Sequence, residues 1–172
     1  DLIDFLNSPN QTVRVLWVSQ HNDMIATIRV KLEKALPELV PALPLVELLA
    51  KQEAVLLMKD PYLPTVTEAA LSAGRKRTRD RAWSLIKPLV ENMPHIFYVN
   101  RRGKLIDDVV INARNGINSS IVKTTKKSIY GYLRRFWQRG MVPNAVLADY
   151  QNCGAKGKER NHTKIKRGRP RK

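Results

Sequence analysis

Cysteine is almost absent from this 172-residue chain, which contains only Cys153. A lone cysteine excludes an internal disulfide and any zinc site built on cysteines. No stretch approaches the run of about 18 apolar residues that a membrane span needs, and no signal peptide opens the chain. Acidic residues are scarce beside basic ones, 15 against 31, for a formal net charge of +16. With 43% hydrophobic residues, the composition indicates a soluble, globular, intracellular protein whose first candidate partner is nucleic acid.

The positive charge is unevenly distributed. Residues 1–60 carry 6 basic and 8 acidic side chains, residues 61–150 carry 16 and 6, and residues 151–172 carry 9 and 1. This shift predicts a domain boundary near residue 60. Because the chain starts at Asp1 and stops within a run of Arg and Lys, we expect it to be a piece of a longer protein.

Residues 1–60 are predicted to form a β-rich module. The segments 12–18 and 24–30 are dense in β-branched residues and are joined by a turn, so they predict a hairpin. A short helix over 45–51 and a strand over 54–58 follow. The module serves either as a docking surface or as a support without a ligand. Its charge makes it the part of the chain least suited to touch DNA.

Residues 61–74 are predicted as a linker with a short helix over 67–72 that Gly74 ends. The run 75–81, with five basic side chains, leads into a helix with a kink or stop at Pro88. The run is either a phosphate clamp or a solvated face.

A second helix is expected over 103–114. Arg101, Arg102 and Lys104 cluster at its start, where positive charge opposes the helix dipole. A contact with a phosphate explains that placement better than a contribution to the stability of the helix does.

The third predicted helix, over 126–139, carries most of the functional argument. Thr124 and Thr125 are candidate N-caps, and Gly140 is a natural stop. Ile129, Leu133 and Phe136 share one apolar arc. The opposite face is polar and basic, and it consists of Lys127, Gly131, Arg134 and Gln138, flanked by Tyr130 and Arg135.

Gly131 lies at the centre of that basic face, although glycine costs a helix interior roughly 1 kcal/mol. The missing side chain lets the helix backbone approach another surface closely. Three helices ending in such an element predict a helix-turn-helix domain whose last helix enters the DNA major groove. The alternative is an ordinary amphipathic helix with a solvated basic face.

The string Ile129–Gly140, followed by Pro143–Ala145 and Asp149–Tyr150, resembles the N-terminal DNA-binding region of the TnsB transposases of Tn-seven-like transposons, some of which are CRISPR-associated. A looser resemblance covers Asp60–Tyr62 and the start of the second helix. One departure is the segment 116–125, which is longer than the turn of a simple helix-turn-helix.

The resemblance implies that this region binds repeated sites in double-stranded DNA of the transposon ends and assembles with other copies on that DNA. A DDE catalytic domain further along would join 3′ ends to target DNA with Mg²⁺. The implied protein partners are the AAA+ regulator TnsC and the endonuclease TnsA. The implied location is the bacterial cytoplasm at the nucleoid.

The C-terminal run 164–172 contains Arg-Gly-Arg-Pro, the core of an AT-hook. An extended strand, narrow at Gly168 and stiffened by Pro170, can lay two Arg side chains along an A·T minor groove. The alternative is a flexible basic linker that meets only phosphates.

No catalytic site or metal site is expected within residues 1–172, and this region needs no cofactor. The DDE reaction requires three carboxylates that converge on two metal ions, and the acidic residues after residue 60 do not suit that site. The three histidines are far apart in sequence. A free-standing helix-turn-helix and AT-hook regulator therefore remains an alternative to the transposase.

The predicted architecture is α+β, with a β-rich module (1–60), a linker and short helix (61–74), a helix-turn-helix domain (75–142) and an extended basic tail (143–172). We expect Lys127, Ser128, Tyr130 and Arg134 to read bases, and Arg135 and Arg139 mostly to meet phosphates. The complete set of predicted DNA-binding residues is Arg75, Lys76, Arg77, Arg101, Arg102, Lys104, Thr125, Lys126, Lys127, Ser128, Tyr130, Gly131, Arg134, Arg135, Gln138, Arg139, Lys166, Arg167, Gly168, Arg169, Pro170 and Arg171.

Replacement of Arg169 by Ala tests the AT-hook. We expect Arg169→Ala to weaken binding most when the DNA beside the recognised site is rich in A·T, because only a narrow minor groove attracts an inserted arginine strongly. Electrophoretic mobility shifts with A·T-rich and G·C-rich flanks provide the measurement. Equal losses on both duplexes would leave this arginine with a phosphate role alone.

Overall fold

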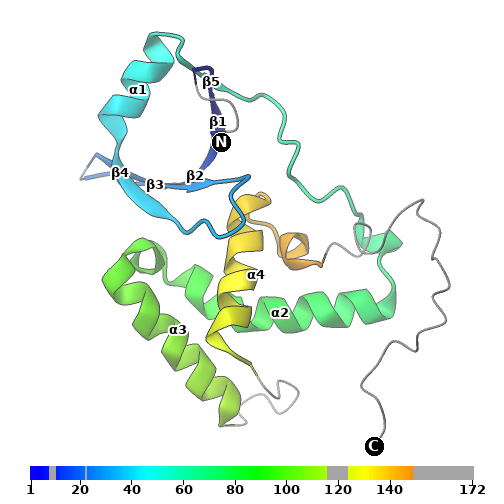
Figure 1. The fold of residues 1–172 in the computed structure, drawn as a ribbon. Coiled ribbons are helices and arrows are strands. Elements are labelled where there is room, and N and C mark those ends of the chain that lie inside the picture. The colour runs from blue at the N-terminus through cyan, green and yellow to red at the C-terminus, as the bar shows by residue number, and fades with distance from the viewer. Residues whose placement is uncertain (8–10, 22, 116–123, 149–172) are drawn as a thin grey trace, which may run out of the picture.

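The computed structural model describes residues 1–7, 11–21, 23–115 and 124–148, and these form an α+β fold, as predicted (Figure 1). The strands are β1 (Leu2–Phe5), β2 (Thr12–Val18), β3 (Met24–Arg29), β4 (Glu38–Pro41) and β5 (Ala54–Leu56). The helices are α1 (Ala42–Ala50), α2 (Ala73–Glu91), α3 (Val99–Arg114) and α4 (Lys126–Gln138). Single 3₁₀ turns are η1 (Glu68–Ala70), η2 (His95–Phe97) and η3 (Pro143–Val146).

The five strands form one antiparallel sheet in the order β4-β3-β2-β1-β5. The predicted hairpin is confirmed as β2 and β3, with Val13 opposite Arg29 and Val18 opposite Ile25. Strands β1 and β4 were not predicted. β4 ends in Pro41 and lies at an edge of the sheet, where the missing N–H of proline breaks no ladder. β1 is too short for an alternating pattern to stand out.

The helices run longer than the sequence patterns indicated. α2 begins at Ala73, where the Ser72 hydroxyl accepts the N–H of Arg75 at 3.4 Å. Gly74 therefore lies in the first turn of α2, and the prediction that it ends a preceding helix is wrong. Of the two outcomes expected at Pro88, a kink or a stop, the stop is wrong, since α2 continues to Glu91. The basic run is thus part of α2 itself.

Three other predicted boundaries also shift. α3 starts at Val99, four residues before its predicted start, and α1 starts at Ala42, three residues before its own. The short helix expected over 67–72 is reduced to the 3₁₀ turn η1. The prediction for α4 is confirmed to within one residue at its end.

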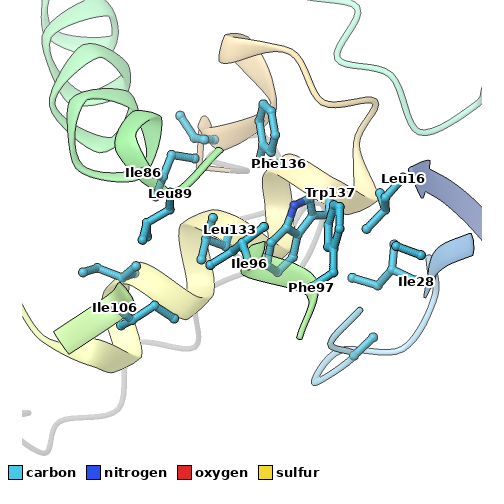
Figure 2. Packing of buried hydrophobic residues seen from close by; sticks show 14 of the residues in the cluster. Leu16, Ile28, Ile86, Leu89, Ile96, Phe97, Ile106, Leu133, Phe136 and Trp137 are labelled. Atoms are coloured by element: carbon cyan, nitrogen blue, oxygen red, sulfur yellow. The ribbon is translucent and has the colours of Figure 1, made fainter. Parts of the chain in front are cut away.

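The sheet and the helices share one hydrophobic core (Figure 2). Trp137 of α4 is fully buried, and its ring lies 6.1 Å from that of Phe97, which in turn lies 6.4 Å from that of Trp17 in β2. Leu16 and Ile28 from the sheet belong to the same cluster. The change of charge near residue 60 therefore does not mark a boundary between two cores, and removal of the sheet would uncover Trp137.

Arg14 joins the sheet to the segment after β5 and to the end of α4. It is 5% exposed, its Nη1 lies 2.5 Å from Asp60 Oδ2, and its Nη2 donates to the Gln138 carbonyl at 3.1 Å. Burial opposes ionisation of Asp60, but hydrogen bonds from Arg14 and from the Tyr62 N–H outweigh it. The pKa of the Asp60 carboxyl therefore lies below its ordinary value.

Replacement of Arg14 tests this joint. Arg14→Met should lower the free energy of unfolding by about 3 kcal/mol at pH 7, because it leaves Asp60 as an unpaired, largely buried charge. The control is Arg29→Met, whose partner Glu38 is exposed and whose loss should cost under about 1 kcal/mol. Urea denaturation measures both.

The deficit of Arg14→Met should also depend on pH. The stabilisation from Asp60 is fully present above the unfolded pKa near 4 and is lost as the pH falls through the lower folded value. The difference from wild type should therefore shrink in acid. Equal costs for both variants, or a deficit that grows in acid, would contradict the buried pair.

Candidate nucleic-acid interface

The start of α4 is fixed by its own sequence. The Thr125 hydroxyl accepts the N–H of Ser128 at 3.2 Å and lies 3.0 Å from the Ser128 hydroxyl, which confirms Thr125 as the N-cap. At the other end, Gly140 has a φ of 90°, and a Cβ there would lie 2.1 Å from Leu63. The left-handed backbone conformation therefore favours glycine at this stop, and the end of the Leu63 side chain would have to move to admit any other residue.

The C-terminal half of α4 is held by the loop between β3 and β4. Arg134 Nε donates to the Ala35 carbonyl at 2.9 Å. Gln138 Nε2 donates to the carbonyls of Leu32 at 2.8 Å and Arg29 at 3.0 Å. Two side chains of the predicted DNA-facing stripe thus position a loop of the sheet module against α4.

Arg135 and Arg139, both predicted to contact phosphates, form hydrogen bonds with backbone carbonyls of this chain. Arg135 Nη1 donates to the Val146 carbonyl at 3.5 Å, and Arg139 Nη1 donates to the Leu147 carbonyl at 3.2 Å. Both bonds fasten η3 and the residue after it to the end of α4. We draw the candidate interface without these two residues.

The N-terminal half of α4 remains open. Thr125, Lys126 and Lys127 are exposed, and Lys126 Nζ lies 2.5 Å from Asp107 Oδ1 of α3. A Cβ at Gly131 would meet no heavy atom within 4 Å, so none of the described residues covers the bare backbone there. The accessible part of the predicted reading face is therefore its first two turns.

A cleft of about 360 Å³ lies between α2 and this open end of α4. Its lining consists of Arg77, Thr78, Arg81, Leu85, Thr124, Ser128 and Tyr132. Thr78 and Arg81 were not predicted as site residues. The signal was the spacing of four residues from Arg77 to Arg81 to Leu85, which places the three on one side of a helix. The sequence prediction does not include Thr78 and Arg81 because it places the basic run at the entrance of the helix.

The other basic residues of the run 75–81, Arg75, Lys76 and Arg79, do not line this cleft. Lys76 Nζ lies 3.7 Å from Glu68. Arg79 pairs with Glu68 and, at 2.8 Å, with Asp80, and it donates to the Asn144 amide oxygen at 2.8 Å. These acidic partners, with the Glu68 hydrogen bond first, hold the pKa of Arg79 above its ordinary value. Arg75 lines a separate cleft beside Arg139 and Tyr62. The five charges therefore do not form one phosphate clamp.

Of the three basic residues predicted at the start of α3, Arg102 is buried, whereas Arg101 and Lys104 are exposed. Arg102 is 3% exposed and donates to the carbonyls of Ile96, Phe97 and Pro37, at 3.0, 2.9 and 3.0 Å. Burial lowers the pKa of Arg102 from its ordinary value, yet its bonds show a structural tie between α3 and the sheet module. We therefore leave Arg102 out of the interface.

Arg101 and Lys104 are the exposed members of the same cluster. Arg101 Nη1 lies 2.6 Å from His95 Nδ1, and its guanidinium lies 5.7 Å from the centre of the Tyr98 ring. Lys104 precedes Asp107 by one turn of α3 and therefore lies on the side from which Asp107 reaches Lys126.

The AT-hook-like residues Lys166–Arg171 lie outside the described residues. Within the described ranges, no three histidine, cysteine or acidic side chains lie close enough together to hold a metal ion. None of the described helices is long and apolar enough to cross a membrane.

Two comparisons with known proteins point to one class, the transposition proteins of mobile DNA elements. Residues 79–150 match the family model of the TnsB second domain. The chain is 29% identical over 155 residues to the transposon Tn7 transposition protein TnsB of Escherichia coli, covering 90% of this chain and 20% of that protein. Both matches support the resemblance to the N-terminal region of TnsB that the residues Ile129–Tyr150 predicted, and this chain spans about a fifth of the length of that relative.

Substitution of Gly131 tests whether the open face of α4 is free of internal contacts. Gly131→Ala should raise the free energy of unfolding by about 0.5–1 kcal/mol, because alanine favours the helix and its methyl group meets nothing. Gly103→Ala in α3 is the matched control, since a Cβ there also meets no atom within 4 Å. Chemical denaturation should show a gain for both. A loss for Gly131→Ala alone would mean that the backbone at this position is not open.

Proposed function

We propose that this region binds double-stranded DNA of transposon ends in a sequence-specific manner, with the first two turns of α4 in the major groove. The observation that carries the proposal is the open, basic end of α4, where Gly131 leaves the backbone bare beside Lys127 in a TnsB-like chain. A major groove admits a helix, and a missing side chain permits close approach to base edges.

The residues proposed to contact bases are those whose side chains reach the open half of α4. Lys127 is exposed, and Tyr130 is partly exposed one turn from Arg134. Arg134 uses Nε to bond the Ala35 carbonyl, which orients its guanidinium while the terminal nitrogens remain able to meet a base edge. These three residues are the proposed readers, and α3 would be the first helix of a helix-turn-helix pair.

The wider assignment follows the likeness to TnsB. We propose that the whole protein is a DDE transposase that joins 3′ ends with Mg²⁺, assembles in several copies on the transposon ends, and works in the cytoplasm with an AAA+ regulator and an endonuclease. In that scheme the region described here supplies DNA recognition, and the AT-hook-like tail extends the contact into the minor groove. Similarity along 90% of the chain favours this assignment over a free-standing regulator.

The central experiment selects a duplex from a random-sequence pool with the 172-residue chain and then compares it with a scrambled duplex across a salt titration. We expect Gly131→Ala to weaken binding to the selected duplex about tenfold and binding to the scrambled duplex little, because a methyl group holds the helix back from the bases. The same variant should be folded and more stable than wild type.

Gly103→Ala is the control for altered helix stability, and it should bind both duplexes as wild type does. If selection enriches no sequence, or if Gly131→Ala weakens both duplexes alike, specific recognition through α4 is wrong. Binding that is strong only at low salt and equal on both duplexes would indicate non-specific electrostatic attraction and no sequence recognition.

A further inference from the structure

The cleft lined by Arg75 (the Arg75 cleft) has a volume of about 350 Å³ and lies where the segment 61–66, the first turn of α2 and η3 meet. Its walls carry several side chains that can form hydrogen bonds, those of Tyr62, Thr65, Arg75, Arg139 and Asn144. None of the described residues that line it is acidic. The cleft therefore offers cations and donors, which is the chemistry that an anion requires.

Arg75 itself lacks a partner among the described residues. Its Nε is buried, and no acceptor lies within hydrogen-bond distance of it. The two other buried donors without an acceptor differ, because Arg14 uses both terminal nitrogens and Trp137 lies in the apolar core. A guanidinium that is partly removed from water without a counter-ion is costly, so such groups are normally paired. The missing partner of Arg75 indicates an anion supplied from outside the chain.

The walls of the Arg75 cleft are fixed by hydrogen bonds within the chain. Asn144 Nδ2 donates to the Val66 carbonyl at 3.2 Å, which ties η3 to the opposite wall. Arg139 Nη1 donates to the Leu147 carbonyl at 3.2 Å, which holds the residue after η3 against the end of α4. These side chains therefore shape the cleft, and Arg75 is the group left to bind in it.

The stability of α2 does not account for Arg75. This residue lies in the first turn of the 19-residue helix, where the helix dipole is positive and no acidic side chain is present. A positive charge opposes the dipole there. An anion in the cleft would be attracted both by the guanidinium and by the first N–H groups of the helix, which have no intrahelical acceptor.

We propose that the Arg75 cleft binds one phosphate of the DNA backbone, contacted by the guanidinium of Arg75. The proposal rests on the proposed function, because it requires bound DNA. The charge of the chain favours a polyanion over an isolated carboxylate: Ala148 lines the cleft, and residues 151–172, which follow shortly after it, carry 9 basic and 1 acidic side chains. DNA would then be held at two places, by base contacts at α4 and by a backbone contact at Arg75.

Substitution of Arg75 tests the phosphate contact. Because a phosphate carries no sequence information, Arg75→Gln should weaken binding to the selected and scrambled duplexes by the same factor, about tenfold. It should also reduce the slope of log affinity against log salt by about 0.9. Arg75→Lys should keep that slope and lose about threefold in affinity, since lysine keeps the charge but not the planar fork of donors.

Lys87→Gln is the matched control for lost charge. It removes one positive charge from the same helix, where Lys87 pairs with Glu91 at 3.7 Å outside the cleft. An exposed pair of this kind contributes little, so affinity for either duplex should change by less than about twofold. A loss as large as that of Arg75→Gln would show that only net charge matters and would overturn the site.

The stability of the free protein gives a second readout. Thermal melting of Arg75→Gln should occur at the wild-type temperature or above it, because the guanidinium has no described partner and opposes the helix dipole. A clear fall in the melting temperature would mean that a group of the chain itself fills the cleft. That result would overturn the proposal.

A third measurement identifies the group that is bound. Neutral methylphosphonates are placed singly along the selected duplex, and wild-type binding should fall at the phosphate that fills the cleft. At that position Arg75→Gln should lose little further affinity, because the partner of the deleted charge is already gone. At all other positions the variant should show its full loss.

The outcomes separate the two proposals. If no methylphosphonate position couples to Arg75→Gln while Gly131→Ala still loses the selected duplex, the phosphate site is overturned and recognition by α4 stands. If Arg75→Gln weakens the selected duplex alone, Arg75 contacts a base and the phosphate site is also overturned. If wild type discriminates between no duplexes, the proposed sequence recognition itself fails.

Discussion

Burial of Trp137 is the constraint on which the rest of the structure depends. This side chain, near the end of α4, is covered by Phe97 and lies in one cluster with Leu16 and Ile28 of the sheet (Figure 2). Since a buried indole contributes several kcal/mol, α4 and the sheet are held as one unit. The C-terminal half of α4 is consequently packed against the sheet, and its N-terminal half extends along α3 (Figure 1). The cleft with α2 lies at that N-terminal end.

The arginines of this chain have two different roles, and net charge does not distinguish them. Arg14, Arg102 and Arg134 satisfy carbonyl groups of the chain itself and so join the sheet to the helices. Guanidinium groups suit such joints because several donors in one plane can serve several carbonyls. By contrast, Arg77 is exposed on α2 and lines the cleft beside Ser128. Arg134 has both roles, since its Nε bonds the Ala35 carbonyl while its terminal nitrogens belong to the proposed reading set.

The sheet module takes part in the proposed interface indirectly. Its loop between β3 and β4 receives hydrogen bonds from Arg134 and Gln138, and Arg102 donates to Pro37 near the end of the same loop. An element with little net charge can therefore orient the helix that we propose reads DNA, without itself binding DNA. Of the two roles expected for residues 1–60, this favours support over docking.

The sequence by itself determined the fold class, the β2–β3 hairpin, the two cap candidates Thr124 and Thr125, the stop at Gly140, the apolar face of α4 and the resemblance to TnsB. These depend on local propensity, periodicity and motif, which are written in neighbouring residues. Only the tertiary structure decided that Arg102 is buried, that Arg134 and Gln138 hold a loop, and that Arg77 and Arg81 meet Thr124 across a cleft. Such pairings join residues between about 40 and 110 positions apart. Periodicity shows which face of a helix is polar, but the neighbours that satisfy that face are set by how the elements pack.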